Sequence, residues 1–132
     1  MRTICILLLV AALLCAASPA FAPPAARVGD TVVGTPHCHG PHGLAGLIPH
    51  PVQGPIIIGC PTVLINGKPA ARVQDTGTTA ACCGPNTFTI TLGSATVLIG
   101  GRPAARQGDA TLHCGMVPGT ITIGSPNVLI GP

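Results

Sequence analysis

The sequence contains no tryptophan, no tyrosine and two phenylalanines, so aromatic residues make up 2% of its 132 positions. A folded core must therefore be built from small and branched aliphatic side chains. The 18 glycines and 15 prolines disfavour helices and favour many tight turns. Length and composition together predict one small all-β domain, and such domains often need a covalent or metal crosslink.

Acidic residues are also scarce. The chain has three, Asp30, Asp75 and Asp109, against six basic residues, which gives a formal net charge of +3. No cluster of lysine and arginine with interleaved aromatics is present, so the sequence predicts no nucleic-acid partner. The absence of glutamate disfavours a metal hydrolase, because such enzymes usually need a carboxylate or similar general base.

The three aspartates each end a copy of one motif. The copies occupy residues 24–30, 69–75 and 103–109 and read PAARVGD, PAARVQD and PAARQGD. In each copy an arginine, Arg27, Arg72 or Arg106, precedes the aspartate by three positions. Because repeat architectures reuse one supersecondary unit, this pattern predicts a structural turn or ion pair in each copy and not an active site.

A second repeat precedes the first. Its copies, at residues 59–67, 93–101 and 124–131, share the pattern Gly-x-x-x-Val-Leu-Ile. The first two copies run into the next PAAR motif, whereas the third ends the sequence and the motif at 24–30 has no such segment before it. We therefore expect residues 128–130 to pair with residues 25–28 and to close a ring of three units.

Each unit is predicted to consist of strands and tight turns. Period-two alternation before the repeat glycines predicts that both members of three pairs face the core: Ile56 and Ile58, Ile90 and Leu92, Ile121 and Ile123. Asn66-Gly67 and Gly100-Gly101 are favoured hairpin turns because they tolerate positive φ. The Pro-Ala-Ala-Arg segment is predicted to be the returning strand, with its proline at a strand start or edge.

Three predicted loops follow the motif aspartates, at residues 31–53, 76–86 and 110–118. They hold every histidine, and every cysteine after residue 22 except Cys60: His37, Cys38, His39, His42, His50, Cys82, Cys83, His113 and Cys114. Equivalent loops of a ring emerge at one end, so we expect these side chains to converge on a transition metal, and tetrahedral zinc suits them best. Disulfides among the cysteines are the alternative, but they give no role to the histidines.

Residues 1–22 have the pattern of a secretory signal. Arg2 precedes an apolar run at residues 4–14, and Ala20-Phe21-Ala22 fits a cleavage site after Ala22. The apolar run is short for a membrane span. We expect a domain of residues 23–132 that is exported and keeps no stable membrane span after cleavage. An uncleaved N-terminal anchor is the alternative.

The triple motif, the Gly-Ser-x-x-Val-Leu-Ile-x-Gly segment and His113-Cys114-Gly115 after the last aspartate resemble the PAAR-repeat proteins. The resemblance covers about residues 23–132. It implies a small cone of three pseudo-threefold β-hairpin units with metal-binding loops at the tip. The blunt base would cap the trimeric valine-glycine-repeat spike of a type VI or related contractile secretion system, one copy per trimer, with effectors as possible cargo.

The resemblance also implies zinc at the tip, held by three histidines and one cysteine. Carried over to this chain, the ligands are His39, His50, Cys82 and His113. His37 is an alternative to His39, and Cys83 and Cys114 are alternatives to Cys82. The implied function is a non-enzymatic spike tip located outside the cell, against the alternatives of an exported metal- or disulfide-stapled surface protein and a zinc hydrolase. Gln74 departs from the motif's glycine, which is expected to alter only a turn.

Overall fold

The computed structural model describes residues 21–37, 49–79 and 86–132, with the backbone alone at residues 50 and 51. Every regular element within these ranges is a strand, which confirms the predicted all-β class. None of the described segments forms a helix that could cross a membrane. Residues 1–20 of the predicted leader lie outside the described residues, and cleavage after Ala22 stays a prediction.

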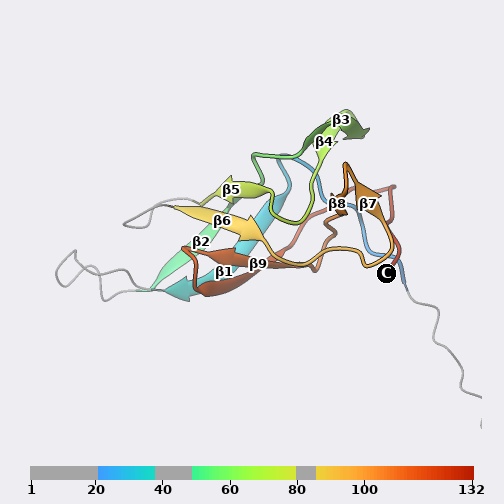
Figure 1. The fold of residues 1–132 in the computed structure, drawn as a ribbon. Coiled ribbons are helices and arrows are strands. Elements are labelled where there is room, and N and C mark those ends of the chain that lie inside the picture. The colour runs from blue at the N-terminus through green and yellow to red at the C-terminus, as the bar shows by residue number, and fades with distance from the viewer. Residues whose placement is uncertain (1–20, 38–48, 80–85) are drawn as a thin grey trace, which may run out of the picture.

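Six antiparallel strands form the main sheet, which curls into a nearly closed barrel (Figure 1). In spatial order they are β2 (His50–Pro55), β1 (Thr31–His37), β10 (Val117–Ile121), β9 (Ala110–His113), β6 (Thr87–Ile90) and β5 (Thr76–Thr78). A bridge between Ile56 and Gly77 joins the two edges of the sheet. A Cβ at Gly54 or Gly77 would overlap the opposite backbone, so glycine at these positions permits the closure.

Two small hairpins extend from the barrel. One pairs β3 (Cys60–Ile65) with β4 (Lys68–Ala70), and the other pairs β7 (Leu98–Ile99) with β8 (Arg102–Pro103). Their turns are the predicted ones, because φ is positive at both central residues: 51° and 76° at Asn66 and Gly67, 55° and 78° at Gly100 and Gly101. This geometry matches the right-handed twist of the flanking strands. The PAAR segment forms the returning strand, as predicted.

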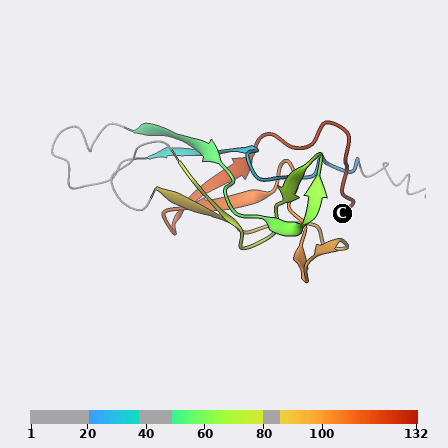
Figure 2. The ribbon, with the colours of Figure 1, turned by 90° about the horizontal axis from the view of Figure 1, so that it is seen from above.

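The N- and C-terminal segments supply the third pair. Pro24 bridges Leu129, and the Ala25 N–H donates to Val128 O at 2.8 Å, which confirms the predicted ring closure. The two hairpins and the paired terminal segments lie at one end of the molecule, which we call the wide end. At the opposite end, the narrow end, β9 ends at His113. Figures 1 and 2 show this division from two sides.

A ring of backbone hydrogen bonds joins the three motif copies. The Ala26 N–H donates to Ala105 O, the Ala105 N–H to Ala71 O, and the Ala71 N–H to Ala26 O, each at 2.9 Å. All three alanines are fully buried. A larger side chain at these positions would separate the backbones, so the repeated Ala-Ala is explained by the close approach of three chains.

Two apolar cores lie on either side of this ring. The barrel core contains Ala26, Val32, Ile56, Ala71, Phe88, Ile90, Ala105 and Ile121, and the wide-end core contains Ala25, Cys60, Ile65, Ala70, Ile99, Ala104 and Ile130. Phe88 is the single aromatic among them. The prediction of a core made of small and branched aliphatic residues is therefore confirmed.

One predicted pattern is wrong. Ile56, Ile90 and Ile121 are buried, but the residues two positions later, Ile58, Leu92 and Ile123, are more than half exposed. In each unit two consecutive N–H groups, those of Ile57 and Ile58 in the first, share one carbonyl oxygen, here Thr76 O. The shared acceptor is the mark of a β-bulge, which adds a residue to one strand and reverses the face of those that follow.

The three predicted loops are also shorter than expected. Residues 31–37, 76–78 and 110–113 are strands β1, β5 and β9, because alternate residues such as Val32 and Thr111 face the barrel interior. His113 therefore lies at the end of a strand and not within a loop. The longer connections, at residues 38–48 and 80–85, lie outside the described residues.

Candidate functional site

In each motif copy the arginine and the aspartate form the same pair. Arg27 Nη2 lies 2.8 Å from Asp30 Oδ1, its Nε lies 3.0 Å from Oδ2, and its backbone N–H donates to Oδ2 at 2.8 Å. The same three bonds recur between Arg72 and Asp75 and in the third copy. These contacts confirm the predicted structural ion pair, since each carboxylate is committed to its own turn.

The motif arginines also connect one unit to the next. Arg27 Nη1 donates to Asn66 Oδ1 at 3.1 Å, in the turn of the following hairpin, and Arg106 Nη1 donates to Gly131 O at 2.9 Å. The hydrogen bond to Asp30 raises the pKa of Arg27, so this link stays charged. Asp75 receives a second arginine, because Arg102 Nη2 lies 2.9 Å from its Oδ1.

The repeated serines have a structural role too. Ser94 Oγ accepts the Val97 N–H at 3.0 Å, and Ser125 Oγ accepts the Val128 N–H at 3.1 Å. Cys60 takes the equivalent place in the remaining unit and is buried. The hydrogen bond with Thr62 lowers the pKa of the Cys60 thiol. These hydrogen bonds hold the turn that precedes each Val-Leu-Ile segment.

The narrow end is organised around His113, which is fully buried. Its ring lies 5.3 Å from that of Phe88, the residue paired with it on β6. A Cβ at Gly119 would overlap His113 Nε2, and a Cβ at Gly34 would lie 2.9 Å from the same atom. Two rings therefore fill this layer of the barrel, and glycines on β10 and β1 leave room for the imidazole.

The three units differ at the position of His113. Four residues after the motif aspartate the chain has Gly34, Thr79 and His113, and two residues after it Val32, Gly77 and Thr111. Only the third unit thus carries a polar pair at these inward positions. We did not predict a role for Thr111. Alignment of the three units on their aspartates is the signal that identifies it.

The two ring nitrogens of His113 have different surroundings. Nε2 lies 3.1 Å from Thr111 Oγ1, whereas buried Nδ1 has no hydrogen-bond partner among the described residues. Burial lowers the pKa of His113, and the nearby charge of His37 lowers it further. The imidazole is therefore held neutral near pH 7, which is the form that binds a metal. An unpartnered buried nitrogen fits a histidine that is a metal ligand.

The other predicted ligands are partly outside the described structure. The backbone of β2 pairs His50 with His37 of β1, at the narrow end, and His37 Nδ1 lies 2.8 Å from Thr35 O. His39 and Cys82 lie outside the described residues, as do the alternatives Cys38, His42 and Cys83. Cys114 follows His113 in a turn. The described residues alone contain no cluster of three or more potential ligands.

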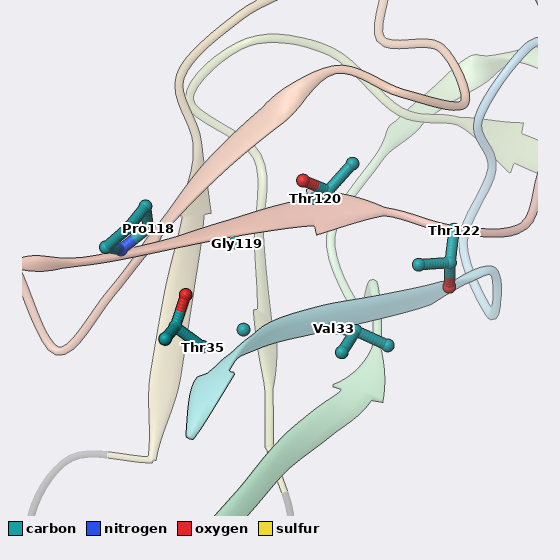
Figure 3. Close-up of a pocket in the computed structure, with 7 residues that line it drawn as sticks. Val33, Thr35, Pro118, Gly119, Thr120 and Thr122 are labelled. Carbon is teal, nitrogen blue, oxygen red and sulfur yellow. The ribbon is translucent and has the colours of Figure 1, made fainter. Parts of the chain in front are cut away.

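A shallow groove of about 330 Å³ lies on the outer face of β1 and β10 (Figure 3). Its lining consists of Val33, Gly34, Thr35, Pro118, Gly119, Thr120 and Thr122. The side chains flanking the two glycines point away from the barrel, because successive residues of a strand face opposite sides. The groove presents hydroxyl and methyl groups without charge, and it is separated from His113 by the strands themselves.

The wide end exposes large apolar side chains at equivalent positions of the three units. One triad is Ile58, Leu92 and Ile123, and the other is Leu64, Leu98 and Leu129. All six are between 51% and 62% exposed. Soluble proteins rarely expose such repeated sets without a partner, so these triads are candidates for an interaction surface.

The sequence model of the PAAR motif matches residues 21–76 and 45–118 of the chain. The two matches overlap and together span most of the sequence, so this chain belongs to the PAAR-motif family. Membership places it among structural, spike-tip proteins of type VI-like secretion systems. No curated protein sequence matches the chain.

Proposed function

We propose that this protein is a non-enzymatic cap on a trimeric valine-glycine-repeat spike of a type VI-like contractile system. The observation that carries the proposal is the pair of exposed apolar triads at the wide end. Each triad takes one residue from each unit, so a single chain presents a near-threefold apolar surface. A threefold-symmetric trimer can bury such a surface with three similar contacts, which predicts one copy of this chain per trimer.

Light scattering of a mixture with a purified spike trimer tests the stoichiometry. We expect a complex of one copy with three spike chains, and a mass with three copies of this chain per trimer would contradict the proposal. Leu98→Asp should weaken the complex, because a charge at the centre of an apolar contact must be desolvated. Thr120→Asp, on the outer face of β10, is the matched control and should bind like the unchanged protein.

We further propose a zinc ion at the narrow end, with His39, His50, Cys82 and His113 as its ligands and His37 as the alternative to His39. The buried Nδ1 of His113 supports a metal there. Zinc with four protein ligands stabilises a fold and leaves no open position for catalysis. The three motif carboxylates are all engaged by arginines, which disfavours the alternative of a zinc hydrolase.

The metal proposal is tested by elemental analysis of the native protein before and after chelation. About one equivalent of zinc and a loss of thermal stability on its removal are expected, because a structural metal contributes directly to folding. Less than about half an equivalent, with unchanged stability after chelation, would favour disulfides in these connections. His39→Ala should lower metal content more than His37→Ala does, and the opposite order would exchange their roles.

We propose that the chain is exported and acts at the tip of the spike, with residues 1–22 removed and effectors carried as further cargo. N-terminal sequencing of the native protein tests the cleavage, and a first residue of Pro23 is expected. A native protein that begins at Met1 would favour the N-terminal anchor. Presence of the protein outside the cell without any contractile apparatus would favour an exported surface protein instead.

A further inference from the structure

We infer that His113 binds its metal through Nδ1 and that Thr111 is the positioning residue that holds the imidazole in the required tautomer. The inference rests on the proposed metal site and goes beyond it, because it assigns the ligating atom and a residue outside the ligand set. Its starting point is the difference between the two ring nitrogens. Nε2 lies 3.1 Å from Thr111 Oγ1, whereas Nδ1 is buried without a hydrogen-bond partner in the described structure.

Packing fixes which edge of the ring can reach a ligand. The Nε2 and Cδ2 atoms face Gly34 and Gly119, where even a single added methyl group would overlap or crowd the ring. Thr111 lies two residues before His113 on β9, so Nε2 points back along the strand toward the barrel core. Nδ1 is not among the ring atoms that these two glycines approach most closely, and it is buried without a hydrogen-bond partner among the described residues.

The tautomer follows from the same contacts. A neutral imidazole carries one proton, and the nitrogen that binds a metal must be the unprotonated one. If Nδ1 is the ligand, Nε2–H is a donor, and Thr111 Oγ1 is placed to accept its hydrogen bond. Hydrogen bonds of this kind orient ligating histidines and raise their basicity. Thr111 is 2% exposed, so water cannot easily replace its hydroxyl.

The repeat provides an independent argument. At the position of Thr111 the other units have Val32 and Gly77, and at the position of His113 they have Gly34 and Thr79. Only the third unit therefore has polar side chains at both inward positions, whereas the first unit has Val32 and Gly34 there. A purely structural layer could be filled by apolar residues, as the buried Ile56, Ile90 and Ile121 fill the layer below it.

The direct test uses the unchanged full chain, labelled with ¹⁵N and loaded with zinc alone. Long-range ¹H–¹⁵N correlation spectra distinguish a protonated from a metal-bound imidazole nitrogen. We expect His113 to show a protonated Nε2 and a metal-bound Nδ1. A metal-bound Nε2, or a His113 unaffected by zinc, would overturn the inference.

Variants test the role of Thr111. Competition with a chelator should show that Thr111→Val weakens zinc binding on the order of 10- to 100-fold, the usual effect of losing such a partner. Thr111→Ser keeps the hydroxyl and should restore most of the affinity, whereas Thr120→Val changes a threonine outside the barrel and should have no effect. Equal zinc affinity of the Val and Ser variants would refute the positioning role.

These results are separable from the spike-tip proposal. The side chains of the exposed apolar triads are more than half exposed at the wide end, whereas Thr111 and His113 are buried inside the barrel. A chain that binds zinc through Nδ1 but forms no complex with the trimer would sustain this inference and refute the cap. A chain that binds the trimer and takes up no zinc would sustain the cap and refute this inference.

Discussion

The two ends of this molecule use the same repeat in opposite ways. At the wide end the three units share most of their sequence, and the Arg–Asp pairs, the alanines of the ring and the exposed leucines each occur three times. At the narrow end the equivalent positions hold glycine, threonine and histidine. Residues that the repeat preserves thus build the frame, and His113, a proposed zinc ligand, is at a position where the repeat varies.

The contrast between the two ends also concerns the carboxylates, because all three aspartates of the chain lie in the repeated motif. A buried aspartate in each unit is stabilised because three hydrogen bonds from its own arginine offset the cost of removing it from water. At the narrow end the largest buried polar side chain is the imidazole of His113 instead, and its packing depends on the space that glycine leaves. We therefore expect substitutions at the two ends to differ in their effects on stability and on zinc binding.

The largest effect is expected when the ring is opened. Deletion of residues 127–132 removes Ile130 from the wide-end core and the Gly131 carbonyl that accepts from Arg106. With a total stability of only about 5–15 kcal/mol in a domain of this kind, the loss of one closure should abolish cooperative folding. Circular dichroism with thermal melting measures this, and an unchanged melting transition would show that the closure is dispensable.

The next largest effect distinguishes two of the three motif ion pairs from each other. Asp75→Asn should cost about 3–5 kcal/mol, because it leaves both Arg72 and Arg102 without their buried counter-charge. Asp109→Asn should cost less, since its pair with Arg106 is more exposed. Urea unfolding of the two variants gives the comparison. Equal losses would mean that the second arginine at Asp75 contributes nothing.

At the narrow end, Gly119→Ala should displace the His113 ring while leaving the wide end intact. Overpacking of a filled layer typically costs about 1–3 kcal/mol, and zinc binding should fall with it. Gly131→Ala is the matched control, because a Cβ there meets nothing within 4 Å. Denaturant unfolding together with a zinc titration checks both. Retained zinc affinity in Gly119→Ala would show that the ring position is not critical.

The smallest effect concerns the one motif copy that departs from glycine. Gln74 has a φ of 72°, and the equivalent Gly29 and Gly108 have φ of 89° and 91°. Because a left-handed conformation costs a non-glycine residue about 1–2 kcal/mol, Gln74→Gly should stabilise the protein by about 1 kcal/mol. Gly108→Ala, in open space, should destabilise it by a similar amount. A lower melting temperature for Gln74→Gly, or a higher one for Gly108→Ala, would contradict this account.

Much of the fold could be predicted because the repeat encodes it. The half-units at residues 24–30 and 124–131 predicted ring closure, which is present. Asn66-Gly67 predicted a tight turn, which is also present. The bulges were not predicted because the hydrophobic pattern does not reveal an extra residue. In Ile56-Ile57-Ile58, for example, every residue is apolar. Each bulge is defined by an acceptor on another strand, such as Thr76 O for Ile57 and Ile58, which the local sequence does not reveal.

The candidate site was less predictable. The histidines and cysteines could be grouped by their place after the motif aspartates, but no spacing rule shows which nitrogen of His113 faces inward. That follows from contacts between different strands, namely the close approach of Gly34 and Gly119 to the ring. His39 and Cys82 lie outside the described residues, so their assignment still rests on the resemblance.

The alanine ring has a consequence for how the chain reaches this fold. Ala26 bonds to Ala71 and Ala105, and Ala25 bonds to Val128, so the partners of the first motif are distant in the sequence and spread along it. Loop-closure entropy must be lost before such distant contacts contribute, which places refolding in roughly the millisecond-to-second range of all-β domains. The ring itself cannot close until the segment around Val128 has been synthesised. The newly made chain therefore passes through an unfolded interval in which chaperones or an export channel can engage it.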